Sequence, residues 1–348
     1  MKQTMKTAIM TGIGKTEIVE RPVPCPTDDE VLVKVEYVGV CGSDLHYYEH
    51  GRIGDYIVEP PFVLGHEAGG TIVKTGKDVT HLKVGDRVAL EPGKTCGKCE
   101  FCRTGRYNLC PDVIFFATPP VDGVFQEYVA HEASLCFKLP ENVSTMEGAL
   151  IEPLAVGFHA ARQGGARAGQ TAFITGSGCI GLVSLLALKA LGVSKVYIAD
   201  IMDNRLEKAQ TLGAAEVINS STNDPVAKLL ELTGGKGCDL FIDTSGIQEC
   251  VTQGIQACKK GGTVVLVGYS ASGEMVLPTS LAIDKELTFK TIFRYRHIYP
   301  MAIEAVADGR VNLRDLPSHF FELDEIQHAL DYSVSNKGDV VKSVIKVS

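Results

Sequence analysis

The chain of 348 residues is 45% hydrophobic and 22% charged, a composition that excludes a disordered protein. Its length predicts two domains of ~150–200 residues. The formal net charge of −8 argues against nucleic acid or an anionic membrane surface as a partner. No apolar run approaches the ~20 residues of a membrane span. Residues 1–10 lack the apolar core of a signal peptide, so we expect a cytoplasmic protein.

The first part of the chain is rich in short β-type runs. Residues 31–40, VLVKVEYVGV, alternate with period two, which is typical of a strand with one buried face. Residues 71–76, 83–90 and 124–131 are similar, and the glycine–aspartate turn at 84–88 is a plausible hairpin corner. Many short strands with Gly and Pro turns predict a compact, barrel-like β domain.

Within this part, Cys41, His66 and Glu67 offer a thiolate, an imidazole and a carboxylate. Together these groups suit Zn²⁺, and a catalytic zinc has three protein ligands and one open position. Glu152 is a fourth candidate, distant in sequence. The alternative is a small buried cysteine and a hydrogen-bonded histidine without a metal.

The segment CGKCEFCRTGRYNLCP predicts a second metal site. The chain has eleven cysteines, an odd number without a signal peptide, so metal binding is more natural than a disulfide framework. Four thiolates fill every position around a tetrahedral Zn²⁺, so this zinc should be structural. An iron–sulfur cluster fits less well, because the ferredoxin run has three residues before its last cysteine and this run has seven. The four ligands are Cys96, Cys99, Cys102 and Cys110.

Residues 146–162, MEGALIEPLAVGFHAAR, have apolar residues at helical spacing and predict one helix with a local kink at Pro153. Glu152 lies inside this apolar stretch. A buried carboxylate without a partner is costly, so we expect Glu152 to face a cation or a metal.

Residues 171–192 combine an apolar strand, a glycine-rich turn and a helix. Gly176, Gly178 and Gly181 have the GxGxxG spacing, with Cys179 and Ile180 at the start of the helix. The glycines allow a tight turn, close approach of a pyrophosphate and helix–strand packing, and the helix N-terminus faces the phosphates.

Asp200 ends the next predicted strand, 196–200. An acid at this place accepts both ribose hydroxyls of NAD and repels the 2′-phosphate of NADP, so we expect NAD. Arg205 is the residue that could instead accommodate a phosphate.

Further strands at 215–220, 238–246 and 262–268, with a helix at 247–259, predict a Rossmann-type α/β domain with a doubly wound parallel sheet. Residues 287–309 run from a strand into a helix. Arg294 lies between them, either on a solvated surface or reaching an acid or a phosphate. The last strand, 340–348, is expected to return to the β-rich domain.

Several stretches together resemble the zinc-dependent medium-chain dehydrogenases over nearly the whole chain, most closely the polyol branch of sorbitol and xylitol dehydrogenases. These stretches are VGVCGSDLHYYEHGRIGDY, LGHEAGG, the four-cysteine lobe, FFATPP, LIEPLAVGFHA, GSGCIG and IFRYR. The resemblance implies a GroES-like catalytic domain at 1–154 and 295–348 with the lobe at 94–112, a Rossmann domain at 155–294, and a homotetramer or a dimer.

The resemblance also implies roles for individual residues. Cys41 and His66 match the catalytic zinc ligands, and either Glu67 or Glu152 completes the set. Ser43 and His46 occupy proton-relay positions. Arg294 matches an arginine near the cofactor and the site acids. The implied substrate pocket contains Tyr47, Ile53, Phe115, Thr118, Glu152 and Tyr295.

The expected activity is oxidation of a secondary hydroxyl of a polyol to a ketose, with zinc promoting loss of the hydroxyl proton and NAD accepting the hydride. Glu152, Arg294, Tyr47 and Tyr295 offer partners for several hydroxyls, which favours a polyol. Two alternatives stay open: a related zinc dehydrogenase acting on threonine, butanediol or a sugar-phosphate alcohol, and a non-catalytic NAD-binding structural protein.

Overall fold

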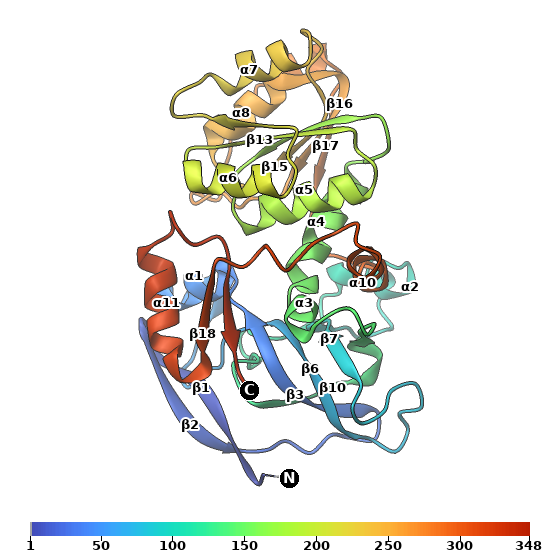
Figure 1. Ribbon diagram of the computed structural model, residues 1–348, viewed down its shortest axis with the longest axis vertical. Coiled ribbons are helices and arrows are strands. Elements are labelled where there is room, and N and C mark those ends of the chain that lie inside the picture. Colours follow the sequence, from blue (N-terminus) through green and yellow to red (C-terminus); the bar gives the residue numbers. More distant parts are fainter. Residues whose placement is uncertain (1) are drawn as a thin grey trace. The chain divides into compact units, whose positions relative to one another are not determined.

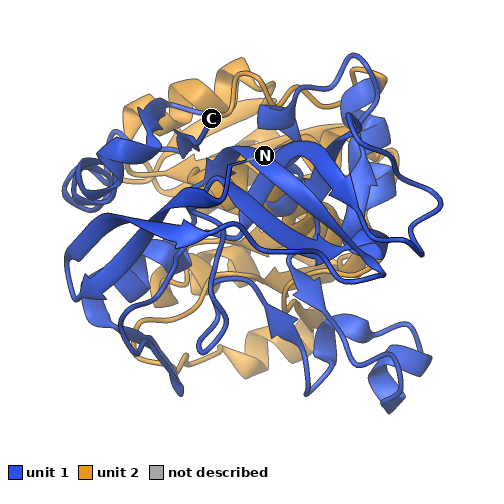
Figure 2. Cartoon of the chain, turned by 90° about the horizontal axis from the view of Figure 1, so that it is seen from below, with its two compact units in different colours: residues 1–152, 299–307, 317–348 blue, residues 153–298, 308–316 orange. Residues whose placement is uncertain are grey.

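A computed structural model describes residues 2–348, which form two compact units (Figure 2). Among the described residues, unit 1 comprises 2–152, 299–307 and 317–348, and unit 2 comprises 153–298 and 308–316. Helix α4 (Ile151–Gln163) begins in unit 1 and continues in unit 2. Each unit has its own sheet.

The main sheet of unit 1 has the strand order β11-β7-β6-β3-β19-β18, and β10 also pairs with β3. Strand β3 is the centre of this sheet, and α11 packs against β18 and β19 (Figure 1). The strands of unit 1 are β1 (Thr4–Gly12), β2 (Lys15–Pro22), β3 (Glu30–Gly39), β4 (Arg52–Ile53), β5 (Tyr56–Ile57), β6 (Glu67–Thr75), β7 (Arg87–Leu90), β8 (Gly93–Lys94), β9 (Ile114–Phe115), β10 (Tyr128–Glu132), β11 (Cys136–Lys138), β18 (His319–Glu322) and β19 (Ser343–Lys346). Its helices are α1 (Gly42–His50), α2 (Glu100–Arg103), α3 (Thr145–Ala149), α10 (Tyr299–Ala307) and α11 (Ile326–Ser335), with 3₁₀ turns η1 (Tyr107–Leu109), η2 (Ala133–Leu135) and η3 (Leu323–Glu325).

Burial explains why β3 is central, although the prediction of one buried face is wrong at Leu32, which is buried in a second cluster. Val31, Val33, Val35 and Val38 are fully buried in one cluster, and β-branched side chains pack well on a pleated surface. Strand β19 pairs antiparallel with β3, so the prediction that the last strand returns to the β-rich domain is confirmed.

The sheet of unit 2 is parallel, with the order β14-β13-β12-β15-β16-β17. This is the strand order of a Rossmann fold, in which ligands bind at the carboxyl ends of the strands, and the predicted α/β fold class is confirmed. Helices α5 and α6 pack on β13, and α7 packs beside α8 (Figure 1). The strands are β12 (Thr171–Thr175), β13 (Lys195–Asp200), β14 (Glu216–Asn219), β15 (Cys238–Asp243), β16 (Cys258–Leu266) and β17 (Thr288–Thr291). The helices are α5 (Cys179–Ala190), α6 (Asp203–Thr211), α7 (Pro225–Leu232), α8 (Gln248–Ala257) and α9 (Thr279–Asp284), beside α4.

The prediction of one kinked helix at 146–162 is wrong. The structure has two helices, α3 and α4, separated at Leu150, so the break lies three residues before Pro153. Pro153 is the third residue of α4, in the first turn, where a missing N–H breaks no intrahelical hydrogen bond. A capping box between Ser144 and Glu147 fixes the start of α3.

Two predicted strands are shorter than expected. In 83–90 only Arg87–Leu90 is a strand. The residues before it form the predicted corner, with Gly85 at φ +92° and the amide of Lys83 donating to Asp86. In 124–131 the strand begins at Tyr128, because the amides of Val124 and Phe125 donate instead to Gly65 and Leu64.

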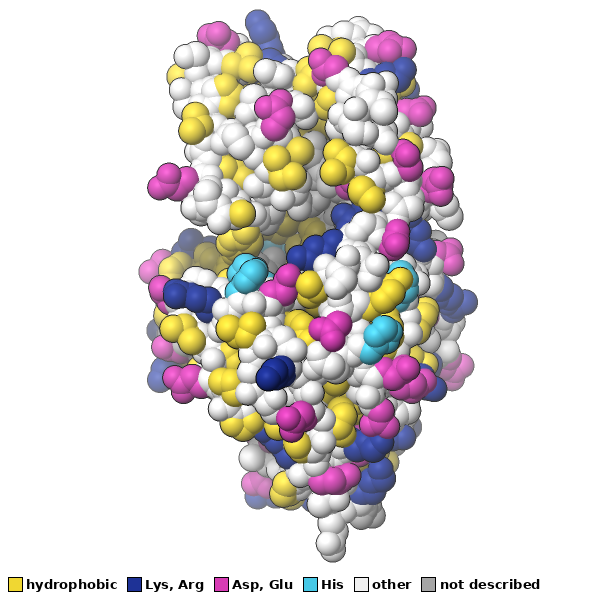
Figure 3. Space-filling model, turned by 90° about the vertical axis from the view of Figure 1, so that its left-hand side faces the viewer, with side chains coloured by type: hydrophobic (Ala, Val, Ile, Leu, Met, Phe, Trp, Pro, Cys, Tyr) yellow, Lys and Arg dark blue, Asp and Glu magenta, His cyan; other side chains and the backbone are white. Residues whose placement is uncertain are grey.

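Charges of both signs share the surface. On the face in Figure 3, Lys and Arg side chains are interspersed with Asp and Glu side chains. Within residues 2–348 we find no helix with both the length and the apolar composition needed to cross a bilayer.

Candidate active site

Strand pairing brings Cys41, His66 and Glu67 together in unit 1. Gly39, the last residue of β3, is paired with Glu67, the first residue of β6. Cys41 lies two residues after the end of β3, and His66 immediately precedes β6. The pairing of these two strands therefore brings Cys41 and His66 close together. One ligand atom from each of the three residues lies within 4.8 Å of the others. His66 and Glu67 are buried and Cys41 is half-buried, so the three groups could hold a metal ion with one side open.

Asp44 supports this group from α1, although the sequence had not singled it out. Its carboxylate is fully buried and lies 3.6 Å from Nδ1 of His66. It also accepts hydrogen bonds from the backbone N–H groups of Cys41 and Gly65, both at 2.9 Å. Because Nδ1 faces this carboxylate, Nε2 is the nitrogen available to a metal. Asp44 follows Cys41 by three residues, which is the spacing of a capping box at a helix N-terminus. This spacing is the one signal in the sequence that could have identified Asp44.

The pKa values of this pair reflect their mutual charge. Burial acts to lower the pKa of His66, but the charges of Asp44 and Cys41 raise it well above its ordinary value. Burial acts to raise the pKa of Asp44, but His66 and the two backbone donors lower it below the usual range. A proton therefore occupies the imidazole readily in the absence of a cation, and a metal must displace that proton.

The donor set fits Zn²⁺. One thiolate, one imidazole and one carboxylate are the ligand types of catalytic zinc sites. The Oε2 atom of Glu67 is buried and lies 2.5 Å from Nζ of Lys342. Its other oxygen, Oε1, accepts a hydrogen bond from Lys342 at 2.6 Å, a partner that the sequence did not reveal. Both oxygens of this buried carboxylate therefore contact the ammonium of Lys342, and a metal bound here would share them with it.

Glu152 does not join this group within the 4.8 Å limit, as searched over residues 2–348. It is buried in the first turn of α4, with 6% of its surface exposed. A second buried acid, Glu91, accepts a hydrogen bond from the Tyr107 hydroxyl at 3.0 Å. Burial raises the pKa of Glu91 to about 7, the hydrogen bond from Tyr107 lowers it, and the charge of Glu152 raises it further. Direct ligation of a metal by Glu152 stays a prediction.

The other residues predicted around the metal in unit 1 are dispersed. The Phe115 ring lies 5.8 Å from the His66 ring, at 55°. The amide of Thr118 donates to Phe115 O at 3.1 Å, so Thr118 belongs to the same loop. Tyr47 is buried in the core cluster and Ile53 packs against it. On α1, Ser43 is half-buried, and His46 is exposed with its ring 4.6 Å from the ring of His50.

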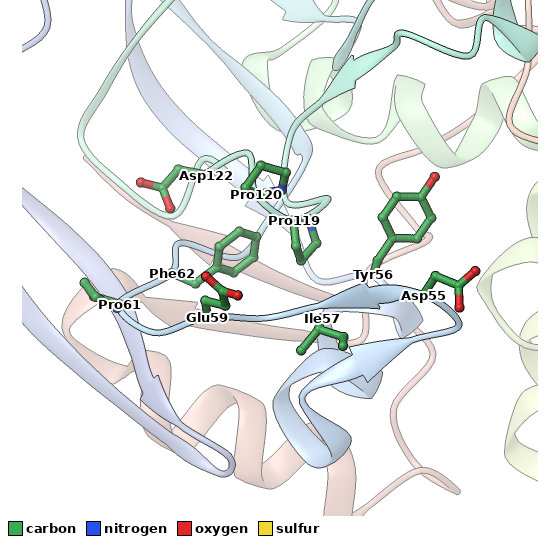
Figure 4. A pocket seen from close by; sticks show the side chains of 9 residues that line it. All are labelled: Asp55, Tyr56, Ile57, Glu59, Pro61, Phe62, Pro119, Pro120 and Asp122. Atoms are coloured by element: carbon green, nitrogen blue, oxygen red, sulfur yellow. The ribbon is translucent and has the colours of Figure 1, made fainter.

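A separate pocket of about 560 Å³ lies in unit 1 (Figure 4). None of the predicted substrate residues lines it. Figure 4 shows Phe62 and Pro119 near its middle. Asp122 is held there by Arg21 at 2.8 Å and by the amide of Val63 at 2.9 Å. The lining residues are Asp55, Tyr56, Ile57, Glu59, Pro61, Phe62, Pro119, Pro120 and Asp122.

The four-cysteine lobe is closed into a second group of ligand atoms, Cys96, Cys99, Cys102 and Cys110, all within 4.8 Å of one another. The Sγ atoms of Cys99 and Cys102 are 3.5 Å apart, and the amide of Cys96 lies 3.4 Å from Sγ of Cys110. Hydrogen bonds from the amides of Lys98 and Cys99 lower the pKa of Cys96 to about 7, whereas burial raises that of Cys110 to about 11. All eleven cysteines are free thiols.

In unit 2 each glycine of the GxGxxG turn has the predicted steric reason. Gly176 has φ +92°. A Cβ at Gly181 would lie 1.8 Å from the carbonyl oxygen of Gly176, so this position must stay a glycine. A Cβ at Gly178 would meet only a guanidinium nitrogen of Arg205, at 3.9 Å, which leaves space for a phosphate. Cys179 and Ile180 begin α5, and a helix N-terminus is a place where phosphate groups bind.

Asp200 ends β13 and is held rigidly beside this turn. Its Oδ2 accepts from the amide of Ser177 at 2.6 Å, and its Oδ1 accepts from the amides of Ile201 and Met202 at 2.7 and 3.0 Å. Arg205 reaches the same turn, where its carbonyl accepts from the Ser177 hydroxyl at 2.9 Å.

Arg294 and Tyr295 also belong to unit 2, in the segment after β17. Arg294 has φ +53°, and its guanidinium lies 4.8 Å from the centre of the Phe293 ring. Tyr295 is buried, with 3% of its surface exposed. A positive φ at a non-glycine residue marks a backbone held by its surroundings, which is frequent at functional sites.

Known proteins match this arrangement over the whole chain. Residues 27–141 match the alcohol dehydrogenase GroES-like domain, and residues 179–308 match the zinc-binding dehydrogenases. The sorbitol dehydrogenase of Bos taurus is 44% identical over 340 residues, covering 97% of this chain and 95% of the relative. That of Bacillus subtilis is 41% identical over 343 residues, covering 99% and 97%.

The crystal structure of an Escherichia coli oxidoreductase of unknown specificity superposes with a TM-score of 0.95 at 40% identity, covering 99% of both chains. Two family matches, the full-length relatives and the two sets of ligand residues agree with one another. The chain therefore belongs to the zinc-dependent medium-chain dehydrogenases, in the branch of the sorbitol dehydrogenases, and is an oxidoreductase that acts on CH–OH groups with zinc and NAD as its cofactors.

Proposed function

We propose that the protein oxidises a secondary hydroxyl of a polyol such as sorbitol or xylitol to the ketose, with transfer of a hydride to NAD. The observation that carries this proposal is the group of one thiolate, one imidazole and one carboxylate within 4.8 Å. Relatives named sorbitol dehydrogenase, at 41% and 44% identity, support the substrate class.

Bound at these sites, Zn²⁺ would act as a Lewis acid on the hydroxyl oxygen and NAD would accept the hydride. Cys41, His66 and Glu67 would hold the metal. A thiolate and a carboxylate together carry −2, which balances the charge of Zn²⁺. Glu152, in its buried position, would bind a substrate hydroxyl or contact the metal. Ser43 and His46 would pass the released proton toward solvent.

The remaining residues of the site would position the substrate and the cofactor. The Phe115 ring would limit the space beside His66, and Tyr47, Ile53 and Thr118 would line the same region. In unit 2 the N-terminus of α5 would bind the pyrophosphate and Asp200 the ribose hydroxyls. Arg205, Arg294 and Tyr295 would contribute further polar contacts to cofactor or substrate. The groups at the pyrophosphate are Gly176, Gly178, Cys179, Ile180 and Gly181.

We also propose that the four-cysteine lobe holds a structural zinc, that the chain forms a homotetramer or a dimer, and that it works in the cytoplasm. Eleven free thiols support a reducing compartment. In domain terms, the residues of unit 1 would hold the metals and those of unit 2 the dinucleotide.

Zinc analysis and a substrate panel test the proposal. We expect two zinc ions per chain and NAD reduction with sorbitol or xylitol. The variants Cys41→Ser and Glu152→Ala should abolish turnover without unfolding the protein. The control Cys25→Ser, which changes an exposed thiol, should keep full turnover. Turnover of threonine, butanediol or a sugar-phosphate alcohol in place of polyols would contradict the substrate class. Full polyol oxidation by zinc-free protein would contradict the mechanism, and NAD binding without activity on any alcohol would favour a structural role.

A further inference from the structure

Lys342 and Glu67 form an ion pair inside unit 1. Their side chains are 3% and 1% exposed, and Nζ lies 2.6 Å from Oε1 and 2.5 Å from Oε2. The same ammonium donates to the carbonyl of Val40 at 2.9 Å. The two residues are 275 positions apart in sequence. A fully buried ion pair is costly to desolvate. Its position beside a thiolate, an imidazole and a carboxylate therefore points to a role at the candidate metal site.

The strand order shows how the lysine reaches the site. Strand β3 lies between β6 and β19, and Lys342 precedes β19 while Glu67 begins β6. Gly39 of β3 lies opposite both strands, paired with Glu67 on one side and Val344 on the other. A Cβ on Gly39 would lie 1.9 Å from Oε2 of Glu67 and 3.0 Å from Cε of Lys342. The missing side chain at Gly39 therefore makes room for the lysine to cross β3.

The ammonium of Lys342 and a metal at this place would compete for one carboxylate. The Cys41 thiolate and the carboxylates of Glu67 and Asp44 sum to −3, neutral His66 adds nothing, and Zn²⁺ would bring the group to −1. With the ammonium of Lys342 the sum becomes zero, so the competition is local, at the two oxygens of Glu67. An ammonium in contact with a ligand carboxylate repels a second cation and shares the same oxygens, in surroundings where such interactions are weakly screened.

We propose that Lys342 is a positioning residue of the metal site: it shares the Glu67 carboxylate with the metal and thereby weakens the hold of the site on zinc. This inference rests on the proposed function, because it assumes that Cys41, His66 and Glu67 bind zinc. Without a metal the lysine balances the buried carboxylate. With a metal it makes Glu67 the weakest of the three ligands.

The test is the rate at which the zinc-loaded full chain releases zinc to excess EDTA. The kinetic phase of zinc release that is absent in Cys41→Ser belongs to the site of Cys41, His66 and Glu67. The remaining phase belongs to the cysteine lobe. We expect Lys342→Met to release zinc from the first site at least about tenfold more slowly than the unmodified protein. Lys342→Arg should restore the original rate. Lys346→Met, which removes an exposed pair with Glu322, is the matched control and should change nothing.

A double variant tests the same inference if Lys342→Met alone does not fold. Replacing both partners leaves no unpaired buried charge, so Glu67→Gln/Lys342→Met should fold. If the lysine acts through Glu67, this double variant should differ in release rate from Glu67→Gln by less than about threefold. Faster or unchanged release from folded Lys342→Met, or an equal effect of Lys342→Met with and without Glu67, would overturn the inference. One zinc per chain in the unmodified protein would instead refute the proposed function.

Discussion

The buried carboxylate of Asp44 lies 3.6 Å from Nδ1 of His66 and anchors the amides of Cys41 and Gly65 at the same time. The Asp44 side chain thus orients the ring of His66. It also holds the backbone at Cys41 and next to His66, and these two residues are candidate metal ligands. Acceptors of this kind set the tautomer and the ring orientation of metal-binding histidines.

Replacing Asp44 by Asn should weaken zinc binding at this site by about 10- to 100-fold, because the amide keeps the shape but loses the negative charge. Competition with a chromophoric chelator measures the change. Asp55→Asn, at an exposed position of the same unit, is the control. Equal zinc affinity in Asp44→Asn and the unmodified protein would show that Asp44 only caps α1.

Replacing Cys99 by Ser should remove one zinc ion per chain and lower the thermal unfolding temperature of the protein. The binding free energy of a structural zinc is folding free energy, about 10 kcal/mol or more in isolated zinc fingers. Zinc content and a thermal melt of the same sample measure both effects. The control Cys25→Ser alters an exposed thiol outside the lobe and should leave both values unchanged. Two zinc ions in Cys99→Ser would contradict the assignment of the lobe.

Replacing Asp200 by Ala should weaken selection of NAD against NADP. The carboxylate is oriented by three backbone N–H groups, and hydrogen bonds to charged groups contribute about 1.5–3 kcal/mol, so the KM for NAD should rise about 10- to 100-fold. The KM for NADP should fall, because Arg205 remains near the turn. Steady-state kinetics with both cofactors measure the ratio, and Asp284→Asn on the exposed part of α9 is the control. An unchanged ratio would show that selection depends on other residues.

Stability should fall between pH 6.5 and pH 4 in part through His131. Burial lowers the pKa of His131 to about 4, against the opposing effect of its 2.8 Å contact with Glu91 O. The unfolded chain takes up this proton near pH 6.5, so the contribution is complete above pH 6.5 and is lost as the pH falls toward 4. The loss should reach about 3 kcal/mol.

Urea unfolding at several pH values measures this effect. His131→Gln keeps a donor for the Glu91 carbonyl but removes the titrating group, so its free energy of unfolding should fall less steeply with pH. His50→Gln, at an exposed histidine, should follow the unmodified protein. Equal slopes for His131→Gln and the unmodified protein would refute the assignment.

Local spacing predicted much of this molecule. The strand at 31–40 and the turn at Gly176 are set by neighbours in sequence and both are present in the structure, but burial along β3 does not alternate, because Leu32 is buried together with Val31 and Val33. The single helix predicted at 146–162 was wrong because the chain is divided at Leu150, three residues before the proline that was expected to mark the irregularity. Lys342 had no sequence signal, because its partner Glu67 becomes its neighbour only through the order of three strands.

The lysine that crosses β3 has a consequence for biosynthesis. During translation Cys41, His66 and Glu67 leave the ribosome long before Lys342, which follows Glu67 by 275 residues. A nascent chain therefore holds the three ligand residues without the ammonium that opposes a cation. The buried carboxylate of Glu67 thus obtains its ion-pair partner only when the C-terminal strand of the chain has been added.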